Sequence, residues 1–176
     1  VEEKITALVE DRQQQPIEKA MRVTKDNEQT LIEEDDIKQA KLHFGYRTNI
    51  TFNDEDYPAL HVFNGLFGGF PSSKLFMNVR EKHSLAYYAA SRIESHKGLM
   101  FVFSGIAPEQ YEKAKTIILE QMEQMRNGEF SDDQLSETKE MTVNQLRETL
   151  DNPQGMIELH YQSVLAKSSI TPEQLL

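Results

Sequence analysis

The chain has 176 residues, enough for one domain with a sizeable core, and does not require a second domain. Its 29 acidic and 19 basic residues give a formal net charge of −10, which excludes a general nucleic-acid or anionic-membrane surface and predicts neutral or basic partners. Cysteine is absent, which excludes disulfides and thiolate zinc sites. No apolar run approaches a membrane span and residues 1–4 do not resemble a signal peptide, so we expect a cytoplasmic protein.

The two ends of the chain differ in character from its middle. Residues 1–36 are mostly charged and polar and include the acidic run 33–36, so we expect a linker or the tail of a preceding unit. Residues 171–176 begin with Thr and Pro, the pattern that starts a helix. We therefore expect residues 37–176 to form one domain that is truncated at its C-terminus.

Alternating apolar residues predict the first strand. Leu42, Phe44 and Tyr46 recur at every second position, the period of a strand with one buried face. The acidic segment that follows supplies N-cap and first-turn residues for a helix. The elements predicted for this half are a strand over residues 40–48, a helix from 53–56 to the glycines at 68–69, and a shorter helix over 72–82.

The second half begins with a hairpin and continues with helices. Gly98 closes the short connection 95–98 and favours a hairpin turn, and Ser131-Asp132-Asp133-Gln134 is a capping box. The predicted elements are strands over 85–94 and 99–106, and helices over 108–127, over 131–150 and from 152 onward. This order predicts an α+β fold, in which helices cover one face of a mostly antiparallel sheet.

Known catalytic motifs are missing from the sequence. A helical zinc site needs two histidines about one turn apart, and none of the five histidines has another three to five residues away. We therefore predict no metal ligands and no cofactor in this chain. There is no Gly-x-Ser-x-Gly elbow, and the glycine-rich run 65–69 lacks the ending of a phosphate-binding loop, so we expect a tight turn there.

One segment, residues 68–87, combines features that could carry chemistry. Arg80 falls near the end of the predicted short helix, seven residues before Tyr87 at the start of a strand. A guanidinium and a phenol that lie together can both donate hydrogen bonds to one carbonyl or oxyanion. The alternative is structural, because Arg80 could stabilise the helix C-terminus and Tyr87 could pack in the sheet.

The same segment resembles the second half-unit of the insulinase, pitrilysin and mitochondrial processing peptidase family of zinc metallopeptidases. The family pattern is Gly-Gly-x-x-Ser-Ser-Arg-Leu-Phe, then Arg-Glu-Lys, then Gly-Leu-Ala-Tyr. Here Lys74 replaces the Arg of the first part, and Ser84 replaces the Gly of the last. The resemblance extends from about residue 37 to the end of the chain.

The resemblance implies an insulinase-like half-unit over residues 37–176 that holds no zinc of its own. Arg80 and Tyr87 would reach toward the substrate beside a zinc ion held by another half-unit. The substrate would be an extended peptide, held by strand addition to a sheet edge. A complementary half-unit or paralogous subunit would be the partner. The residues implied in substrate binding are Gly68, Gly69, Ser72 and Ser73.

Two further interpretations remain open from the sequence. The protein that contains this chain could be catalytically inactive and serve as a structural or peptide-presenting subunit for an active paralogue. The chain could also be an unrelated α+β domain that shares the motif by chance. A zinc motif in another half-unit of the same protein would distinguish an active peptidase from an inactive one.

Overall fold

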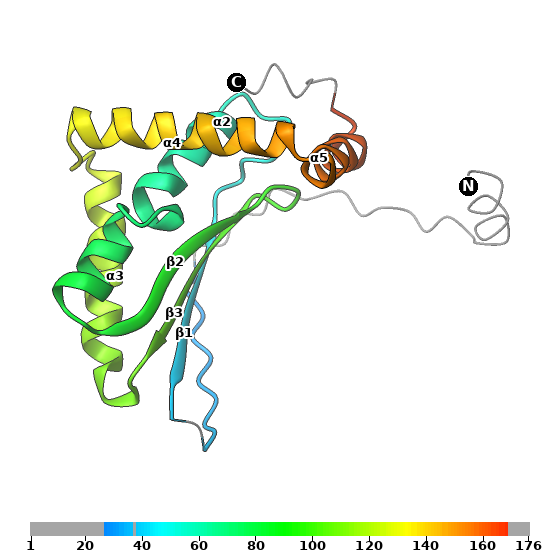
Figure 1. Cartoon of the computed structure of the whole chain (residues 1–176). Helices are drawn as coiled ribbons and strands as arrows, with labels where there is room; N and C mark the ends of the chain where they lie inside the picture. The colour runs from blue at the N-terminus through cyan, green and yellow to red at the C-terminus, as the bar shows by residue number, and fades with distance from the viewer. Residues whose placement is uncertain (1–26, 37, 169–176) are drawn as a thin grey trace, which may run out of the picture.

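The computed structural model describes residues 27–36 and 38–168, which form a small sheet and a layer of helices (Figure 1). Most of the predicted linker and the predicted helix start at 171–176 lie outside the described residues. The elements in chain order are β1 (Ala40–Arg47), α2 (Tyr57–Asn64), η1 (Gly65–Gly69), η2 (Phe76–Lys82), β2 (Ala86–Glu94), β3 (Leu99–Ile106), η3 (Pro108–Gln110), α3 (Tyr111–Arg126), α4 (Asp132–Asp151) and α5 (Pro153–Ala166).

The sheet has the strand order β1-β3-β2, and both pairings are antiparallel. The hairpin between β2 and β3 turns at Gly98, whose φ of +60° is the left-handed value that glycine adopts most easily. β1 lies on the far side of β3, where Phe44 is opposite Val102. The predicted α+β fold with an antiparallel sheet is therefore confirmed.

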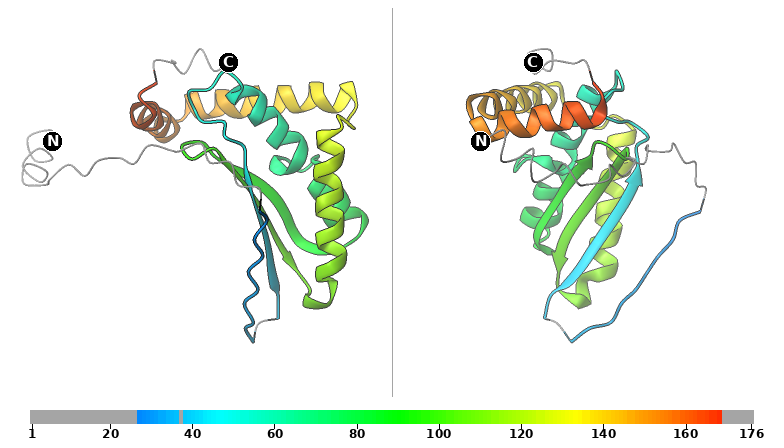
Figure 2. Two further views of the ribbon diagram at one scale, coloured as in Figure 1. Left: turned by 180° about the vertical axis from the view of Figure 1, so that it is seen from behind. Right: turned by 90° about the vertical axis from the view of Figure 1, so that its right-hand side faces the viewer.

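Helices cover one face of this sheet and form the core with it. α3 runs along that face, with η1 and η2 beside it, while none of the described helices runs along the opposite face (Figures 1 and 2). Side chains from both layers are fully excluded from water, and examples are Phe67, Leu75, Val79, Val102, Ile106 and Ile118. Burial of this apolar surface is the main source of stability for the layered arrangement.

The glycine run 65–69 is not the tight turn expected from the sequence. It forms η1, a π-helical continuation of α2. A Cβ on Gly65 would lie 2.6 Å from the Thr138 methyl carbon, and one on Gly68 would lie 2.7 Å from the backbone nitrogen of Ser91. The glycines are needed because α4 and β2 approach the helix too closely for any side chain.

The later helices begin where the local sequence predicts. The Ser131 hydroxyl accepts from the Gln134 N–H at 3.1 Å, and the Gln134 side chain accepts from the Ser131 N–H at 3.0 Å, so both bonds of the capping box form. The Asn152 side chain caps α5 by accepting from the Gln154 N–H at 3.0 Å. α4 runs across one end of the molecule, and α5 turns away from it (Figure 2).

Candidate functional site

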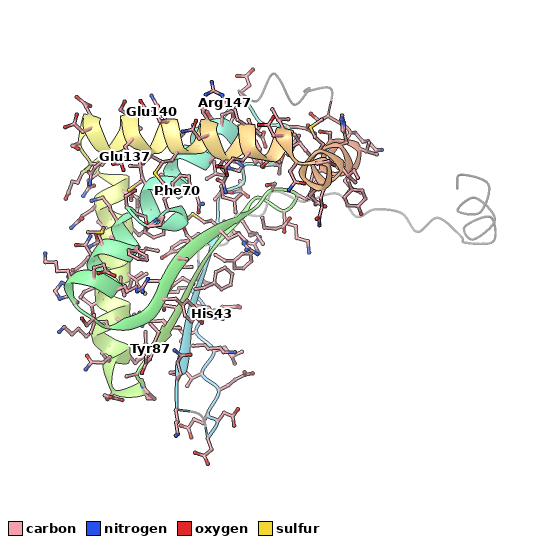
Figure 3. The ribbon with its side chains drawn as sticks, viewed as in Figure 1. His43, Phe70, Tyr87, Glu137, Glu140 and Arg147 are labelled. Atoms are coloured by element: carbon pink, nitrogen blue, oxygen red, sulfur yellow. The ribbon has the colours of Figure 1, made fainter. Side chains whose placement is uncertain are left out.

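The uncovered face of the sheet carries a distinct set of side chains. The register places Lys41, Gly105 and Tyr88 in one row across the three strands. The next row contains His43, Phe103 and Ala90, and the row after it Gly45, Phe101 and Arg92. Strand alternation sends all of these to the face away from α3, as His43 shows in Figure 3.

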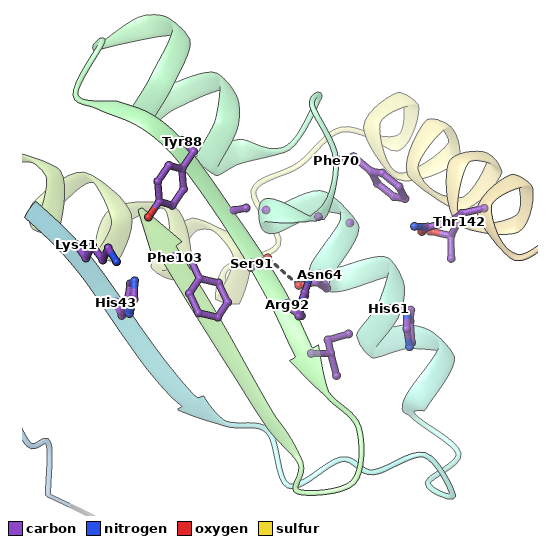
Figure 4. A pocket seen from close by; sticks show the side chains of 16 residues that line it. Lys41, His43, His61, Asn64, Phe70, Tyr88, Ser91, Arg92, Phe103 and Thr142 are labelled. Carbon is purple, nitrogen blue, oxygen red and sulfur yellow. Dashed lines mark hydrogen bonds between the residues drawn. The ribbon is translucent and has the colours of Figure 1, made fainter. Parts of the chain in front are cut away.

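A groove of about 760 Å³ lies on this face, bounded by β2 and by the helices beside it. Lys41 and His43 enter it from β1, Phe103 from β3, and Tyr88 and Arg92 from β2 (Figure 4). The other wall is formed by residues of α2, η1 and α4, namely His61, Asn64, Gly65, Gly68, Gly69, Thr142 and Gln145. The groove therefore has an aromatic floor, polar walls and space for a segment of another chain.

Hydrogen bonding and aromatic packing fix this surface. The Ser91 hydroxyl donates to Asn64 Oδ1 at 2.7 Å and joins β2 to the end of α2. On the floor, the rings of His43 and Phe103 meet edge to face with their centroids 5.2 Å apart. The groove is consequently a preformed feature of the fold.

A β-bulge sets which tyrosine faces the groove. Ala86 pairs with Ile106 and Tyr88 with the adjacent Gly105, so Tyr87 is an extra residue without a partner on β3. A Cβ on Gly105 would lie 2.5 Å from the Tyr88 ring, so that ring lies directly over the glycine. Tyr87 is 68% exposed and is not part of the groove wall. The bulge thus points the two neighbouring tyrosines into different surroundings.

Arg80 lies on η2 at the surface of the helical layer. Its guanidinium stacks over the Phe76 ring at 4.6 Å, and its Nε lies 3.7 Å from a Glu81 carboxylate oxygen. No interaction between Arg80 and Tyr87 occurs within the described part of the chain. Both side chains are solvent-exposed, and neither lines the groove.

The turn that links these two residues is formed at Ser84. The Ser84 N–H donates to the Arg80 carbonyl at 2.9 Å, and the Leu85 N–H donates to the Val79 carbonyl at 3.0 Å. These bonds close the end of η2 with Ser84 at a φ of +50°. A left-handed residue at this point explains the glycine of the family pattern, because glycine adopts that conformation without steric cost. Ser84 therefore keeps the turn despite the substitution.

The residues predicted to bind substrate have different environments. Gly68 is buried and Gly69 is exposed, and both line the groove. Ser72 is exposed, and its hydroxyl lies 3.8 Å from the Met141 sulfur. Ser73 is only 2% exposed, and its hydroxyl accepts from the Phe76 N–H at 3.4 Å at the start of the helix. The two glycines thus adjoin the groove, whereas Ser73 caps a helix.

The electrostatics of the groove depend on its basic side chains. Burial lowers the pKa of His61, whose ring packs edge to face on Tyr57 with centroids 4.6 Å apart. His61 is therefore mainly uncharged at neutral pH. Lys41 and Arg92 carry the formal positive charges of the groove, and no aspartate or glutamate among residues 27–36 and 38–168 lines it.

Apart from Gly68 and Gly69, the residues that line the groove were not predicted from the sequence. Lys41 and His43 occupy the exposed positions between the apolar residues of the predicted strand, so the alternation could have identified them. Alternation places Tyr88 and Arg92 on one face, but the bulge at Tyr87 shifts that face relative to the buried Ala86, so the start of β2 does not show that it is the groove face.

The described residues offer neither a metal site nor a membrane-spanning helix. Nowhere in residues 27–36 and 38–168 do three histidine, aspartate or glutamate side chains group so that they could hold a metal ion. The residues present thus do not fit the zinc site of a metallopeptidase. None of the described helices combines the length and apolarity needed to cross a membrane.

Comparison with known proteins places these features in a family. Residues 1–142 match the family model described as the peptidase M16 inactive domain. The chain is 56% identical over 146 residues to a Bacillus subtilis protein named probable inactive metalloprotease YmfF, which covers 83% of this chain and 34% of that protein. The chain spans about one third of the length of the curated relatives it matches.

Solved structures agree with this assignment. A conserved protein from Enterococcus faecalis V583 matches with a TM-score of 0.72 and 42% identity, over 78% of this chain and 33% of that one. A peptidase M16 inactive domain from Pseudomonas fluorescens has the same fold, with a TM-score of 0.59 and 19% identity over 78% of this chain and 36% of its own. The chain therefore belongs to the peptidase M16 family, the insulinase-like metallopeptidases expected from the motif, and matches the inactive domain of that family.

Proposed function

We propose that this chain holds an extended peptide on the uncovered face of its sheet, as the half-unit of an M16 peptidase that binds no zinc. Peptide hydrolysis would belong to a zinc-binding half-unit that encloses the peptide from the other side. The observation that carries the proposal is the groove on the face of the sheet that the helices leave open. An unfolded segment fits such a site, because it can lay side chains on the aromatic floor.

The sheet also offers main-chain hydrogen bonds to a peptide. On the β2 edge, Gly68 lies against the backbone nitrogen of Ser91, so η1 occupies the middle of that edge. The outer edge of β1 has no strand partner within the described residues. A peptide that crosses the groove toward Lys41 and His43 could pair with β1, which would give affinity with little demand on sequence.

Arg80 and Tyr87 have the properties required of residues that contact a substrate on a facing half-unit. The Arg80 side chain is 44% exposed and Tyr87 is 68% exposed, so neither side chain is packed in the core. Two hydrogen bonds anchor η2 and the residues just before it to α3, one from Lys74 Nζ to Gln124 at 3.1 Å and one from Asn78 to Gln121 at 2.8 Å. The bulge re-aims Tyr87 out of the strand alternation, as bulges beside active sites often do.

A second candidate function is favoured by one observation. The 56%-identical relative carries the name of an inactive metalloprotease. By analogy, the assembly that contains this chain would present peptides or stabilise a partner without cleaving anything. The groove would keep its role in this case, whereas Arg80 and Tyr87 would have no effect on hydrolysis.

The proposed function can be tested by direct binding. A fluorescently labelled, unstructured peptide of about twelve residues should bind the full chain in a polarisation titration, and Phe103→Ala should weaken that binding. Metal analysis of the same sample should find no stoichiometric zinc. Absence of binding, or one tightly held zinc per chain, would contradict the proposal.

Peptide cleavage by an assembled peptidase distinguishes the two candidate functions. The chain is combined with a zinc-binding M16 half-unit, and cleavage of the peptide is compared among the parent, Arg80→Ala and Tyr87→Phe. A loss of kcat in both variants with unchanged peptide affinity supports the clamp. Cleavage that both variants leave unchanged would assign Arg80 and Tyr87 to packing, and no cleavage in any assembly favours the inactive subunit.

A further inference from the structure

The charge of the groove is opposite to that of the whole chain. The protein has ten more acidic than basic residues, yet Lys41 and Arg92 line the groove together with His43, and no carboxylate of the described part of the chain does. A random sample of this surface would contain more carboxylates than cations. The positive charge of the groove therefore bears on the charge of its ligand, which the net charge of the chain does not indicate.

The two cations are not used by the fold. Lys41 and Arg92 are exposed, and neither forms an ion pair with any residue in the described part of the chain. The nearest carboxylate along the same face of β2 belongs to Glu94, which accepts a hydrogen bond from the His96 N–H at 3.1 Å. Lys41 and Arg92 are thus available to a ligand.

Aromatic rings lie between these cations. Phe103 is centred on the face, with His43 edge to face against it, and the Tyr88 ring covers Gly105 in the neighbouring row. A ligand that reaches both charges must cross this apolar floor. Its middle is therefore expected to be apolar and its flanking positions charged.

The sheet register gives the spacing. Lys41 and Arg92 are two rows apart, since one is in the row of Gly105 and the other in that of Phe101. They are separated by about 14 Å along the strands and about 10 Å across them, at about 3.4 Å per residue and about 4.8 Å per strand. The direct separation of the two backbone positions is therefore about 17 Å, whereas side chains at positions i and i+4 of an extended peptide point to one side and lie about 13 Å apart. The long, flexible side chains of Lys41 and Arg92 can close the remaining distance of about 4 Å.

We propose that the groove selects acidic peptide segments, with two carboxylates about four residues apart and an apolar side chain between them. This inference rests on the proposed function and names the substrate class for it. Lys41 and Arg92 each pair with one carboxylate, and Phe103 and Tyr88 contact the residue between. A nucleic acid is a poor alternative, because a net charge of −10 repels a polyanion while a short peptide with two charges enters the groove.

The test compares three labelled peptides of identical length on the full chain. They carry Glu, Gln or Lys at positions i and i+4, and Leu at i+2. The Glu peptide should bind about fivefold tighter than the Gln peptide, which is the scale expected of two exposed ion pairs. That preference should shrink as salt is raised from 50 to about 500 mM, because exposed charges are then screened.

Matched variants assign the preference to the groove. Lys41→Gln with Arg92→Gln should abolish it, whereas Lys113→Gln with Arg126→Gln should leave it intact. The control residues are exposed on α3, behind the other face of the sheet, and remove the same charge. Charge reversal by Lys41→Glu with Arg92→Glu should turn the preference toward the Lys peptide, and circular dichroism checks that each variant is folded.

The outcomes separate this inference from the function on which it rests. Equal binding of all three peptides would overturn the acidic preference and leave peptide binding in place. A preference that survives loss of both groove cations would also overturn it, since the carboxylates would then bind elsewhere. Competition by inorganic phosphate as strong as that by the Glu peptide would reduce the site to a simple anion site. If no peptide binds, the proposed function itself fails.

Discussion

The two faces of the sheet come from the same three strands but have different roles. One face sends Leu42, Val102 and Ile106 into an apolar core under α3 and η1. The other sends His43 and Phe103 into an open groove. Alternation along a strand makes this division possible, because adjacent residues point to opposite sides.

Substitutions on the covered face should therefore affect stability, and substitutions on the uncovered face should affect binding. On the covered face, side chains such as Val102 and Ile106 are fully buried, so a substitution that removes or adds volume there changes stability directly. On the uncovered face, the rings and charges border water and can change at little cost to the fold. The following predictions test that division, from the largest effect to the smallest.

Phe67→Ala should be the most damaging change. Phe67 is completely buried between η1 and the sheet, and its truncation leaves a cavity. We expect a loss of about 3–5 kcal/mol in the free energy of unfolding, measured by urea denaturation. Phe103→Ala on the open face is the matched control, with an expected loss below about 1 kcal/mol and weaker peptide binding. Equal losses would contradict the division between the faces.

Gly68→Ala should destabilise the fold by about 1–3 kcal/mol. The added methyl group would lie 2.6 Å from the Ser91 hydroxyl and 2.7 Å from its backbone nitrogen, so η1 must move away from β2. Gly45→Ala adds the same group on the uncovered face, where the nearest atom is 3.7 Å away in the Phe101 ring. That control should change stability by less than about 0.5 kcal/mol in the same denaturation experiment.

Tyr46→Phe should stabilise the protein by about 1 kcal/mol, because the buried Tyr46 hydroxyl has no hydrogen-bond partner among the described residues. Burial, with a smaller contribution from Glu28, raises the pKa of Tyr46 to about 12. The unfolded chain then loses this proton first, near pH 10, so stability falls as pH rises from about 10 to about 12.

The variant should show a smaller fall over that alkaline range in thermal denaturation at stepped pH. Tyr161→Phe on α5 provides the control. Tyr161 is 55% exposed, so this substitution should change neither the stability at neutral pH nor its fall between about pH 10 and 12. An alkaline profile that Tyr46→Phe leaves unchanged would show that another group is responsible.

Ser84→Gly should give the smallest effect, a gain of about 0.5 kcal/mol. Glycine relieves the left-handed backbone at φ +50°, although part of the gain is offset by the greater freedom of glycine in the unfolded chain. Ser84→Ala keeps the strain and should not stabilise the protein. A loss of stability on introducing glycine, measured as a lower Tm, would contradict this account of the turn.

Much of the fold could be predicted because its signals are local. Each of these signals acts within a few residues: the capping box at residues 131–134, the turn glycine at Gly98 and the alternation from Leu42 to Tyr46. These signals predicted the strands, the helices and their order. The prediction of a tight turn at residues 65–69 was wrong. Glycine is required there because α4 and β2, which are distant in sequence, approach the backbone closely.

The site could be predicted only in part. The motif of residues 68–87 identified the family and marked Arg80 and Tyr87, whose roles stay predictions, and Gly68 and Gly69, which do line the groove. Lys41, Phe103 and Arg92 come from three strands, and their convergence depends on a register that no local pattern encodes. The net charge predicts neutral or basic partners, and this stays a prediction; it averages over a surface that includes a groove lined by Lys41 and Arg92.

The amino-acid sequence by itself determined the family, the order of the elements and the absence of a helical zinc motif. Each of these is written in residue identity and short-range spacing. Only the tertiary structure decided which face of the sheet stays open and which tyrosine the bulge turns into the groove. It also decided that two cations, without an ion-pair partner among the described residues, flank an aromatic floor. Those features arise from packing between segments far apart in the chain, where the free energy of burial, and not local propensity, selects the arrangement.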